Sequence, residues 1–157
     1  MTKDGPKVLE TNVRPGAPET ESLMRQMENP LEMFNACARE KLDPARLKMN
    51  ARFAVCLVLA SSGYPEVYTK GHRIVGIENA MEDQDVQVFH AGTLIADGTL
   101  YTNGGRVLSV TATGKDLFET LMKAYDGAVK IQFLDKQGKD TKYYRKDIGH
   151  QGIKAMT

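Results

Sequence analysis

The sequence contains no tryptophan and only two cysteines among its 157 residues. Two cysteines are too few to form the disulfide framework of a small secreted domain. Cys37 and Cys56 each fall in an apolar stretch, where a free thiol behaves as a small hydrophobic side chain. We therefore expect two buried free thiols and a reducing compartment, the cytoplasm.

The chain also lacks an excess of charge of one sign and long hydrophobic runs. It has 21 lysine and arginine residues against 20 aspartate and glutamate residues, a formal net charge of +1. A nearly neutral chain has no large field to attract nucleic acid or an anionic membrane. No apolar run approaches the roughly 20 residues that cross a bilayer, and the first residues lack the pattern of a signal peptide. We expect neither nucleic acid nor a membrane as a partner.

A turn signal followed by a short strand opens the chain. Residues 3–6, Lys-Asp-Gly-Pro, precede an apolar strand predicted over residues 8–12. A hairpin turn has a strand on each side, and too few residues stand upstream of this one to form the first strand. The sequence therefore predicts a chain that begins inside a fold.

Three polar side chains share one face of this predicted strand. Residues two apart on a strand point to the same side, so Glu10, Asn12 and Arg14 project together, and Val13 faces the other way. A carboxylate and an amide oxygen suit a hard divalent cation such as magnesium, and an arginine suits a phosphate. The spacing alone leaves two interpretations open: a cation and phosphate site, or an edge strand with a solvated polar face.

A pair of glycines provides a second candidate site. The segment is Asn103-Gly104-Gly105-Arg106. Two glycines allow the backbone to approach a ligand closely, and exposed N–H groups beside an arginine can bind an anion. The other interpretation is a simple turn between the strands on either side.

The sequence predicts a helix start at Asn29, which is followed by Pro30 at the first helical position and by Glu32 at the third. We expect a helix from this point and a connector over residues 41–50. The apolar side chains repeat at helical spacing through Leu31, Phe34, Ala38 and Leu42.

Apolar segments separated by turns predict β-strands in the rest of the chain. The continuous run over residues 53–60 predicts a strand buried on both faces. Shorter strands are predicted over residues 86–89 and 107–111. An Asp-Gly pair between apolar residues predicts a two-residue hairpin over residues 94–101.

One further helix and a hairpin complete the expected fold. Residues 113–116 resemble a capping box, and residues 131–134 and 142–145 flank a polar segment as a final hairpin would. The pattern is an antiparallel sheet with one packed helix, an α+β arrangement. The apolar face of the helix is predicted to contain Leu117, Phe118, Leu121, Ala124, Tyr125 and Ala128.

Several sequence blocks in a fixed order carry a family resemblance. Residues 9–21, Leu-Glu-Thr-Asn-Val-Arg-Pro-Gly-Ala-Pro-Glu-Thr-Glu, resemble the end of the ATP-grasp domain of glycinamide ribonucleotide synthetase, also called phosphoribosylamine–glycine ligase. Further blocks that are similar to this family cover nearly the whole chain in the family's order, which makes the joint match specific. They lie at residues 59–65, 68–71, 88–93, 102–108 and 144–149.

The resemblance implies two parts in the chain. Residues 1–48 would be the C-terminal remnant of an ATP-grasp domain, and residues 49–157 the C-terminal domain of the synthetase. The upstream ATP-grasp domains would be supplied in cis or in trans. The complete enzyme would be an ATP-dependent carbon–nitrogen ligase that joins glycine to 5-phosphoribosylamine in de novo purine biosynthesis, through an acyl phosphate of glycine.

The resemblance also implies roles for individual residues. Glu10 and Asn12 would be ligands of Mg²⁺ (or Mn²⁺) on the phosphates of ATP, and Arg14 would be a catalytic phosphate contact. The turn that contains the two glycines and Arg106 would contact a bound phosphate or help to close the site. One carboxylate and one amide do not complete a magnesium site. We therefore expect the chain alone to bind Mg-ATP very weakly and to be inactive.

Two residues depart from the family pattern. Pro15 stands where phenylalanine or leucine is expected, and it removes a backbone donor and favours an extended Arg14. Ala17 stands where an aspartate is expected, and alanine cannot orient a substrate amine. These departures leave an alternative open: a non-catalytic interaction module, from a truncated paralogue or a split enzyme, that acts by association through an exposed strand edge.

Overall fold

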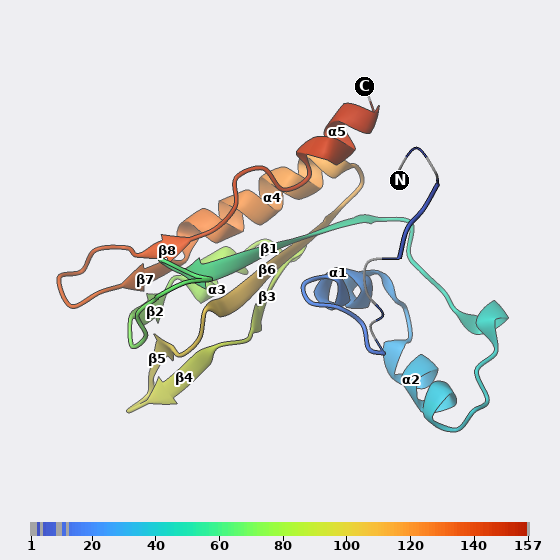
Figure 1. The fold of residues 1–157 in the computed structure, drawn as a ribbon, viewed down its shortest axis with the longest axis horizontal. Helices are drawn as coiled ribbons and strands as arrows, with labels where there is room; N and C mark the ends of the chain where they lie inside the picture. The colour runs from blue at the N-terminus through green and yellow to red at the C-terminus, as the bar shows by residue number, and fades with distance from the viewer. Residues whose placement is uncertain (1–2, 4, 9–10, 12, 157) are drawn as a thin grey trace.

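The computed structural model of the chain describes residues 3, 5–8, 11 and 13–156. Within this part of the chain, the first of two antiparallel sheets has the strand order β3-β6-β1-β8. Figure 1 shows its two long central strands, β1 and β6, lying along helix α4 (Leu117–Lys130). The strands are β1 (Phe53–Ser61), β3 (Val86–His90), β6 (Arg106–Gly114) and β8 (Lys142–Tyr143).

The second sheet consists of shorter strands in the order β4-β5-β2-β7, and its neighbouring strands are also antiparallel. The predicted α+β class is confirmed, but the strands divide between two sheets where the sequence pattern predicted one. The strands of this sheet are β2 (Arg73–Val75), β4 (Thr93–Ala96), β5 (Thr99–Thr102) and β7 (Gln132–Leu134).

Helices contact both faces of the first sheet. The register pairs Leu57 with Val110, and these two side chains join the buried cluster that also contains the inner face of α4. On the opposite face, the hydroxyl of Ser109 donates a hydrogen bond to Glu21 of helix α1 (Glu19–Gln26) at 3.2 Å. Strand β6 is therefore buried along nearly its whole length, since successive side chains of a strand point to opposite faces.

The start of α4 differs from the predicted capping box by a few residues. Asp116 is the N-cap, and its Oδ1 accepts a hydrogen bond from the backbone N–H of Glu119 at 2.8 Å. Thr113, the expected cap, lies in β6. Phe118 was predicted on the buried face but is 67% exposed, because the core side of α4 is the side of Leu121, Ala124 and Ala128.

The N-terminal part of the chain contains one expected and one unexpected helix. Helix α2 (Pro30–Ala38) begins at the predicted position but ends before Leu42, which lies in the connector with the short 3-10 helix η1 (Pro44–Arg46). Helix α1 was not predicted, since its sequence is mostly polar. The strand predicted over residues 8–12 includes residues 9, 10 and 12, which lie outside the described residues.

The predicted C-terminal hairpin is confirmed only at its turn. A turn after β7 brings Leu134 and Asp140 together in a single bridge, but β7 then pairs with β2 and β8 with β1, in different sheets. The side chain of Lys142 explains the divergence: its Nζ donates hydrogen bonds to the carbonyls of Ala128 and Ile131 at the end of α4. This contact lies where β8 joins the edge of the first sheet beside β1.

The hairpin from β4 to β5 is confirmed. Asp97 has a φ of 48° and Gly98 a φ of 71°, the left-handed pair that a two-residue turn of this kind requires. Two short helices, α3 (Ile77–Ala80) and α5 (His150–Met156), were not predicted from the sequence. Among the residues that the structure describes, no helix is long and apolar enough to cross a membrane.

Candidate functional site

A groove of about 490 Å³ lies on the first sheet, next to the segment that leads into α1. The walls of the groove come from Pro18, from β1 and from the segment after β8. We call it the Arg106 groove, because Arg106 lines it. Nη1 of Arg106 donates a hydrogen bond to the carbonyl of Ala17 at 3.2 Å. The structure thus brings one predicted site residue against the stretch that carries the family resemblance at the start of the chain.

The groove contains two arginines with different surroundings. Arg145 is paired with Asp147, at 2.9 Å from Nε to Oδ1 and 2.6 Å from Nη2 to Oδ2, and this hydrogen-bonded carboxylate raises the pKa of Arg145. Arg106 forms no ion pair with any described residue. Its guanidinium is therefore available to an anion that enters the groove.

The two predicted glycines are required by the packing of the chain itself. A Cβ on Gly105 would lie 2.1 Å from the ring of Tyr64, and a Cβ on Gly104 would lie 2.9 Å from Cα of Gly92. The carbonyls of both glycines accept hydrogen bonds from Ser61, at 2.8 Å each. The two glycines were predicted to let the backbone approach a ligand closely. In the structure, the absence of a Cβ allows close contacts within the fold itself.

The backbone N–H groups of this turn differ from its carbonyls. Neither Gly104 nor Gly105 donates a backbone hydrogen bond to the described part of the chain, although both carbonyls are engaged. The turn therefore has a structural role within the fold, and its role in binding an anion stays a prediction.

The other predicted residues are not brought into the groove by any contact of the described chain. Arg14 is exposed, and its Nη1 donates to the carbonyl of Pro15 at 2.7 Å. Glu10 and Asn12 lie outside the described residues. Among the described residues, no group of three or more His, Cys, Asp or Glu side chains could hold a metal ion.

The sequence gave no signal for the aromatic walls of the groove. Tyr64 and Tyr144 line it, and Tyr64 also packs edge-to-face on Tyr68 with a centroid distance of 5.8 Å. The Tyr-Pro pair falls in residues 59–65, for which the sequence indicated only the family resemblance. Its proximity to Gly105 could not be read from the sequence, because the two segments are about 40 positions apart and meet only through the pairing of β1 with β6.

The two cysteines have different environments. Cys37 is exposed, so the prediction that it is buried is wrong, because α2 presents this side chain to solvent. Cys56 is partly buried in the Arg106 groove, where burial and the negative charge of Glu21 raise its pKa to about 12. Oε2 of Glu21 is buried and has no hydrogen-bond partner among the described residues.

We expect a thiol reagent at pH 8 to modify Cys37 rapidly and Cys56 slowly. The thiolate is the reactive form, and a raised pKa leaves Cys56 almost fully protonated. The measurement is the rate of iodoacetamide modification in single Cys→Ser variants. In the Cys37→Ser background, Glu21→Gln removes a negative charge near Cys56 and should shift its reaction to lower pH. Equal rates at the two cysteines would contradict the assigned environments.

The comparisons with known proteins agree on one family. Residues 54–151 match the family described as phosphoribosylglycinamide synthetase, C domain. A phosphoribosylamine–glycine ligase of Synechocystis sp. is 46% identical over 149 residues, which are 94% of this chain and 34% of that protein. A bifunctional purine biosynthetic protein of Schizosaccharomyces pombe is 40% identical over 154 residues, 98% of this chain and 18% of that protein.

A solved structure supports the same relationship. The crystal structure of phosphoribosylamine–glycine ligase from Thermotoga maritima matches with a TM-score of 0.71 and 36% identity, over 92% of this chain and 34% of that chain. The chain thus spans about a third of the length of these two ligases. By its sequence and its fold, the chain belongs to the phosphoribosylglycinamide synthetase family and carries the C domain of that family.

Proposed function

We propose that this chain supplies the C-terminal part of an ATP-dependent carbon–nitrogen ligase that joins glycine to 5-phosphoribosylamine in purine biosynthesis. The observation that carries the proposal is the Arg106 groove. An arginine without an ion pair among the described residues lies there beside the glycine turn, in a chain whose relatives are named phosphoribosylamine–glycine ligases. A phosphorylated substrate or ATP supplies the anion that such a group binds.

Within this function, Arg106 and the amides of Gly104 and Gly105 hold a phosphate group. Arg14 is a second phosphate contact, on the segment that leads to the groove. Glu10 and Asn12 contribute two ligands to Mg²⁺ or Mn²⁺, and such a metal, when bound with ATP, neutralises phosphate charge during phosphoryl transfer. The remaining ligands come from ATP, from water and from outside this chain, because the described residues contain no metal-binding cluster.

The N-terminal helices support the idea of an ATP-grasp partner in cis or in trans. The connector and α2 expose apolar side chains, among them Leu31 at 82% and the half-exposed Phe34 and Leu47. An exposed apolar surface of this kind marks an interaction site. We assign residues 1–48 to the end of an ATP-grasp domain and residues 49–157 to the C-terminal domain of an enzyme that works in the cytoplasm.

A chimaera tests this function. The upstream two thirds of the Synechocystis ligase are joined to this chain, and ADP formation is measured with glycine, 5-phosphoribosylamine and ATP. We expect activity from the chimaera and none from the chain alone. In the chimaera, Arg106→Ala should lower kcat/KM at least about tenfold, since the lost contact to a charged phosphate is worth roughly 1.5–3 kcal/mol.

Arg39→Ala is the matched control, because Arg39 is exposed on the C-terminal side of α2 and its side chain has no hydrogen bond with the described residues. It should leave kcat/KM unchanged. An inactive but folded chimaera would refute the ligase function for this chain and favour a non-catalytic interaction module. The exposed apolar side chains of α2 provide the surface for that second function.

A further inference from the structure

Ser61, the last residue of β1, directs both of its hydrogen-bond donors to the glycine turn, residues 103–106. Its N–H donates to the carbonyl of Gly105 and its hydroxyl to the carbonyl of Gly104, at 2.8 Å each. Ser61 is 3% exposed, and a buried hydroxyl that lost its acceptor would cost free energy. Ser61 therefore fixes the orientation of two successive carbonyls of the turn.

A fixed carbonyl also fixes the N–H of the same peptide unit. The peptide bond between Gly104 and Gly105 is trans, so its C=O and N–H point in opposite directions. Because Ser61 holds the carbonyl of Gly104, the N–H of Gly105 points away from Ser61. This N–H has no acceptor among the described residues, although Gly105 is buried. Buried donors without an acceptor are rare in folded proteins, and this one indicates an acceptor outside the described chain.

The ends of the glycine turn are held by Gly92. The N–H of Gly92 donates to the carbonyl of Arg106 at 3.0 Å, and its carbonyl accepts a hydrogen bond from the N–H of Asn103 at 2.7 Å. Gly104 lies so close that a Cβ on Gly92 would be 2.7 Å from its Cα. Since both ends and both glycine carbonyls are held, the donors of the turn are ordered in advance, which lowers the entropy cost of binding a ligand.

The ring of Tyr64 accounts for the burial of Gly105. A Cβ on Gly105 would lie 2.1 Å from this ring, so the ring lies directly on the turn. Tyr64 lines the Arg106 groove and is 36% exposed, and its hydroxyl has no hydrogen bond with the described residues. Such a side chain can change its rotamer rapidly, and rotation of the ring opens a path from the groove to the N–H of Gly105.

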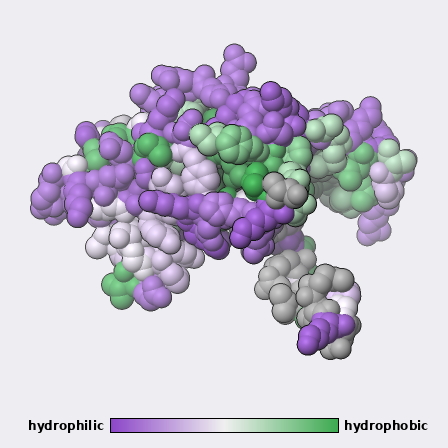
Figure 2. Space-filling model, turned by 90° about the horizontal axis from the view of Figure 1, so that it is seen from above, coloured by the Kyte–Doolittle hydropathy of each residue, from purple (hydrophilic) through white to green (hydrophobic). Residues whose placement is uncertain are grey.

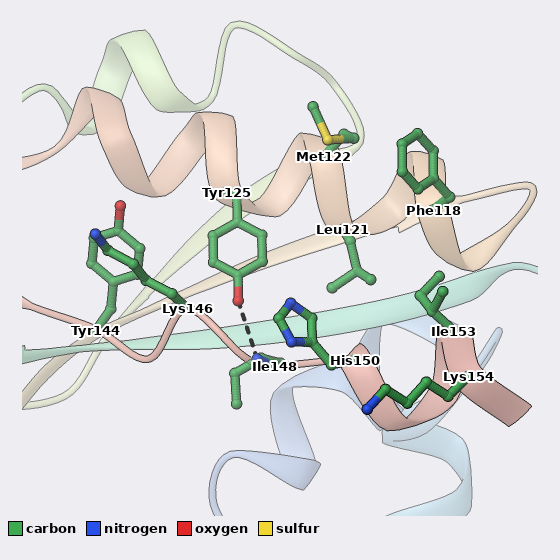
Figure 3. Close-up of a pocket in the computed structure, with 10 residues that line it drawn as sticks. All are labelled: Phe118, Leu121, Met122, Tyr125, Tyr144, Lys146, Ile148, His150, Ile153 and Lys154. Atoms are coloured by element: carbon green, nitrogen blue, oxygen red, sulfur yellow. Dashed lines mark hydrogen bonds between the residues drawn. The ribbon is translucent and has the colours of Figure 1, made fainter.

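The segment that follows β8 forms another wall of the groove and is fixed to α4. The hydroxyl of Tyr125 accepts a hydrogen bond from the N–H of Ile148 and donates one to the carbonyl of Arg145, both at 3.2 Å (Figure 3). The other side of this segment faces α4 and α5, where Figure 2 shows an apolar area surrounded by hydrophilic surface. Ordered contacts thus hold the groove on the side of the glycine turn and on the side of this segment.

We infer that Ser61 is a positioning residue of this site, which orients the N–H of Gly105 toward a phosphate oxygen bound by the guanidinium of Arg106. The inference rests on the proposed function, in which the groove holds a phosphate group. Ser61 acts through the turn and not on the phosphate itself, because the turn accepts both of its donors. A guanidinium and an oriented backbone N–H bind a phosphate together. The phosphate belongs to 5-phosphoribosylamine or to ATP, and kinetics distinguish the two.

The test is Ser61→Ala in the chimaera with the upstream part of the Synechocystis ligase. It should raise the KM of the substrate whose phosphate lies in the groove about fivefold, the equivalent of one hydrogen bond. The kcat should change less than about twofold, and the KM of glycine, which carries no phosphate, should stay the same. A rise for ATP alone assigns the phosphate to the nucleotide, and a rise for 5-phosphoribosylamine alone assigns it to the sugar. Ser61→Cys has a weaker donor and should give a smaller rise, which provides a second measurement if the alanine variant does not fold.

The matched control is Thr120→Val, which also removes a buried hydroxyl that donates to a carbonyl. Thr120 is 0% exposed, and its hydroxyl donates to the carbonyl of Asp116 at 2.6 Å, within α4 and away from the groove. It should leave all three KM values unchanged. Wild-type KM values in Ser61→Ala, an equal rise for all three substrates, or equal rises in the control would overturn the inference and leave the ligase function intact. An inactive wild-type chimaera would refute the ligase function, and the inference with it.

Discussion

Replacement of Phe133 by alanine is expected to lower the free energy of unfolding by about 3–5 kcal/mol. The side chain is 0% exposed and is among the largest in the buried cluster. It lies on β7 opposite Ile74 of β2, and its carbonyl accepts hydrogen bonds from the N–H and hydroxyl of Thr141. These contacts limit collapse of the surrounding chain, so most of the vacated volume should remain as a cavity.

Urea unfolding measures this effect through the midpoint, with the slope unchanged. The matched control is Phe118→Ala, since Phe118 is 67% exposed on α4 and should contribute less than about 1 kcal/mol. Phe133→Leu keeps much of the buried volume and should cost roughly 1–2 kcal/mol, which makes the site measurable even if the alanine variant does not fold. Similar losses for the two alanine variants would contradict the assigned core.

The elements that were predicted correctly have local signals. The apolar run that became β1 and the Asp-Gly turn between β4 and β5 need no information from distant residues. Helix α1 and strand β2 gave no such signal. Helix α1 is mostly polar and is held by contacts with the sheet, including the hydrogen bond from Ser109 to Glu21. Strand β2 has only three residues and is held between β5 and β7.

The final hairpin shows how a correct local signal can mislead. The polar segment does turn, and Asp140 bridges to Leu134 as a hairpin residue would. Beyond that point, the hydrogen bonds of Lys142 to the end of α4 and the pairing of β8 with β1 determine the course of the chain. Burial lowers the pKa of Lys142, because it removes the ammonium group from water. No local pattern contains this information.

The candidate site, like the fold, was predictable only where a local pattern indicated it. The Gly-Gly-Arg segment indicated an anion-binding turn, and Arg106 does lie in a groove without an ion pair among the described residues. The sequence could not indicate that Tyr64 packs on Gly105 or that Arg145 is paired with Asp147. The assignments of Glu10, Asn12 and Arg14 stay predictions. They depend on the family resemblance and on groups outside this chain.

A second substitution with a large expected effect on stability is that of Asp85. This residue lies just before β3 and connects four parts of the fold. Its carboxylate accepts a hydrogen bond from Lys123 of α4 at 2.6 Å and lies 2.6 Å from the guanidinium of Arg52, which precedes β1. Its backbone carbonyl accepts hydrogen bonds from Arg25 of α1 at 2.9 Å and from Thr113 of β6 at 3.1 Å. One residue thus joins both helices that cover the first sheet to two of its strands.

We expect Asp85→Asn to lower the free energy of unfolding at pH 7 by about 1.5–3 kcal/mol, the usual value of hydrogen bonds to charged groups. The hydrogen bond from Lys123 lowers the pKa of Asp85, burial opposes this effect, and Arg52 adds to the lowering. Asp126→Asn is the matched control, because Asp126 is exposed on α4 and forms no hydrogen bond or ion pair with the described residues. It should change stability by less than about 0.5 kcal/mol.

The pH dependence identifies the charge of Asp85 as the cause. Because the pKa of this carboxyl is lower in the folded than in the unfolded state, its contribution is fully present above the unfolded value of about 3.9. The contribution is lost as the pH falls through the lower pKa of the folded state. Urea midpoints of wild type and Asp85→Asn should therefore differ at pH 7 and converge as the pH falls through the lowered pKa of the folded state. A difference that stays constant throughout the acid range would mean that the geometry of the side chain, and not its charge, holds these elements together.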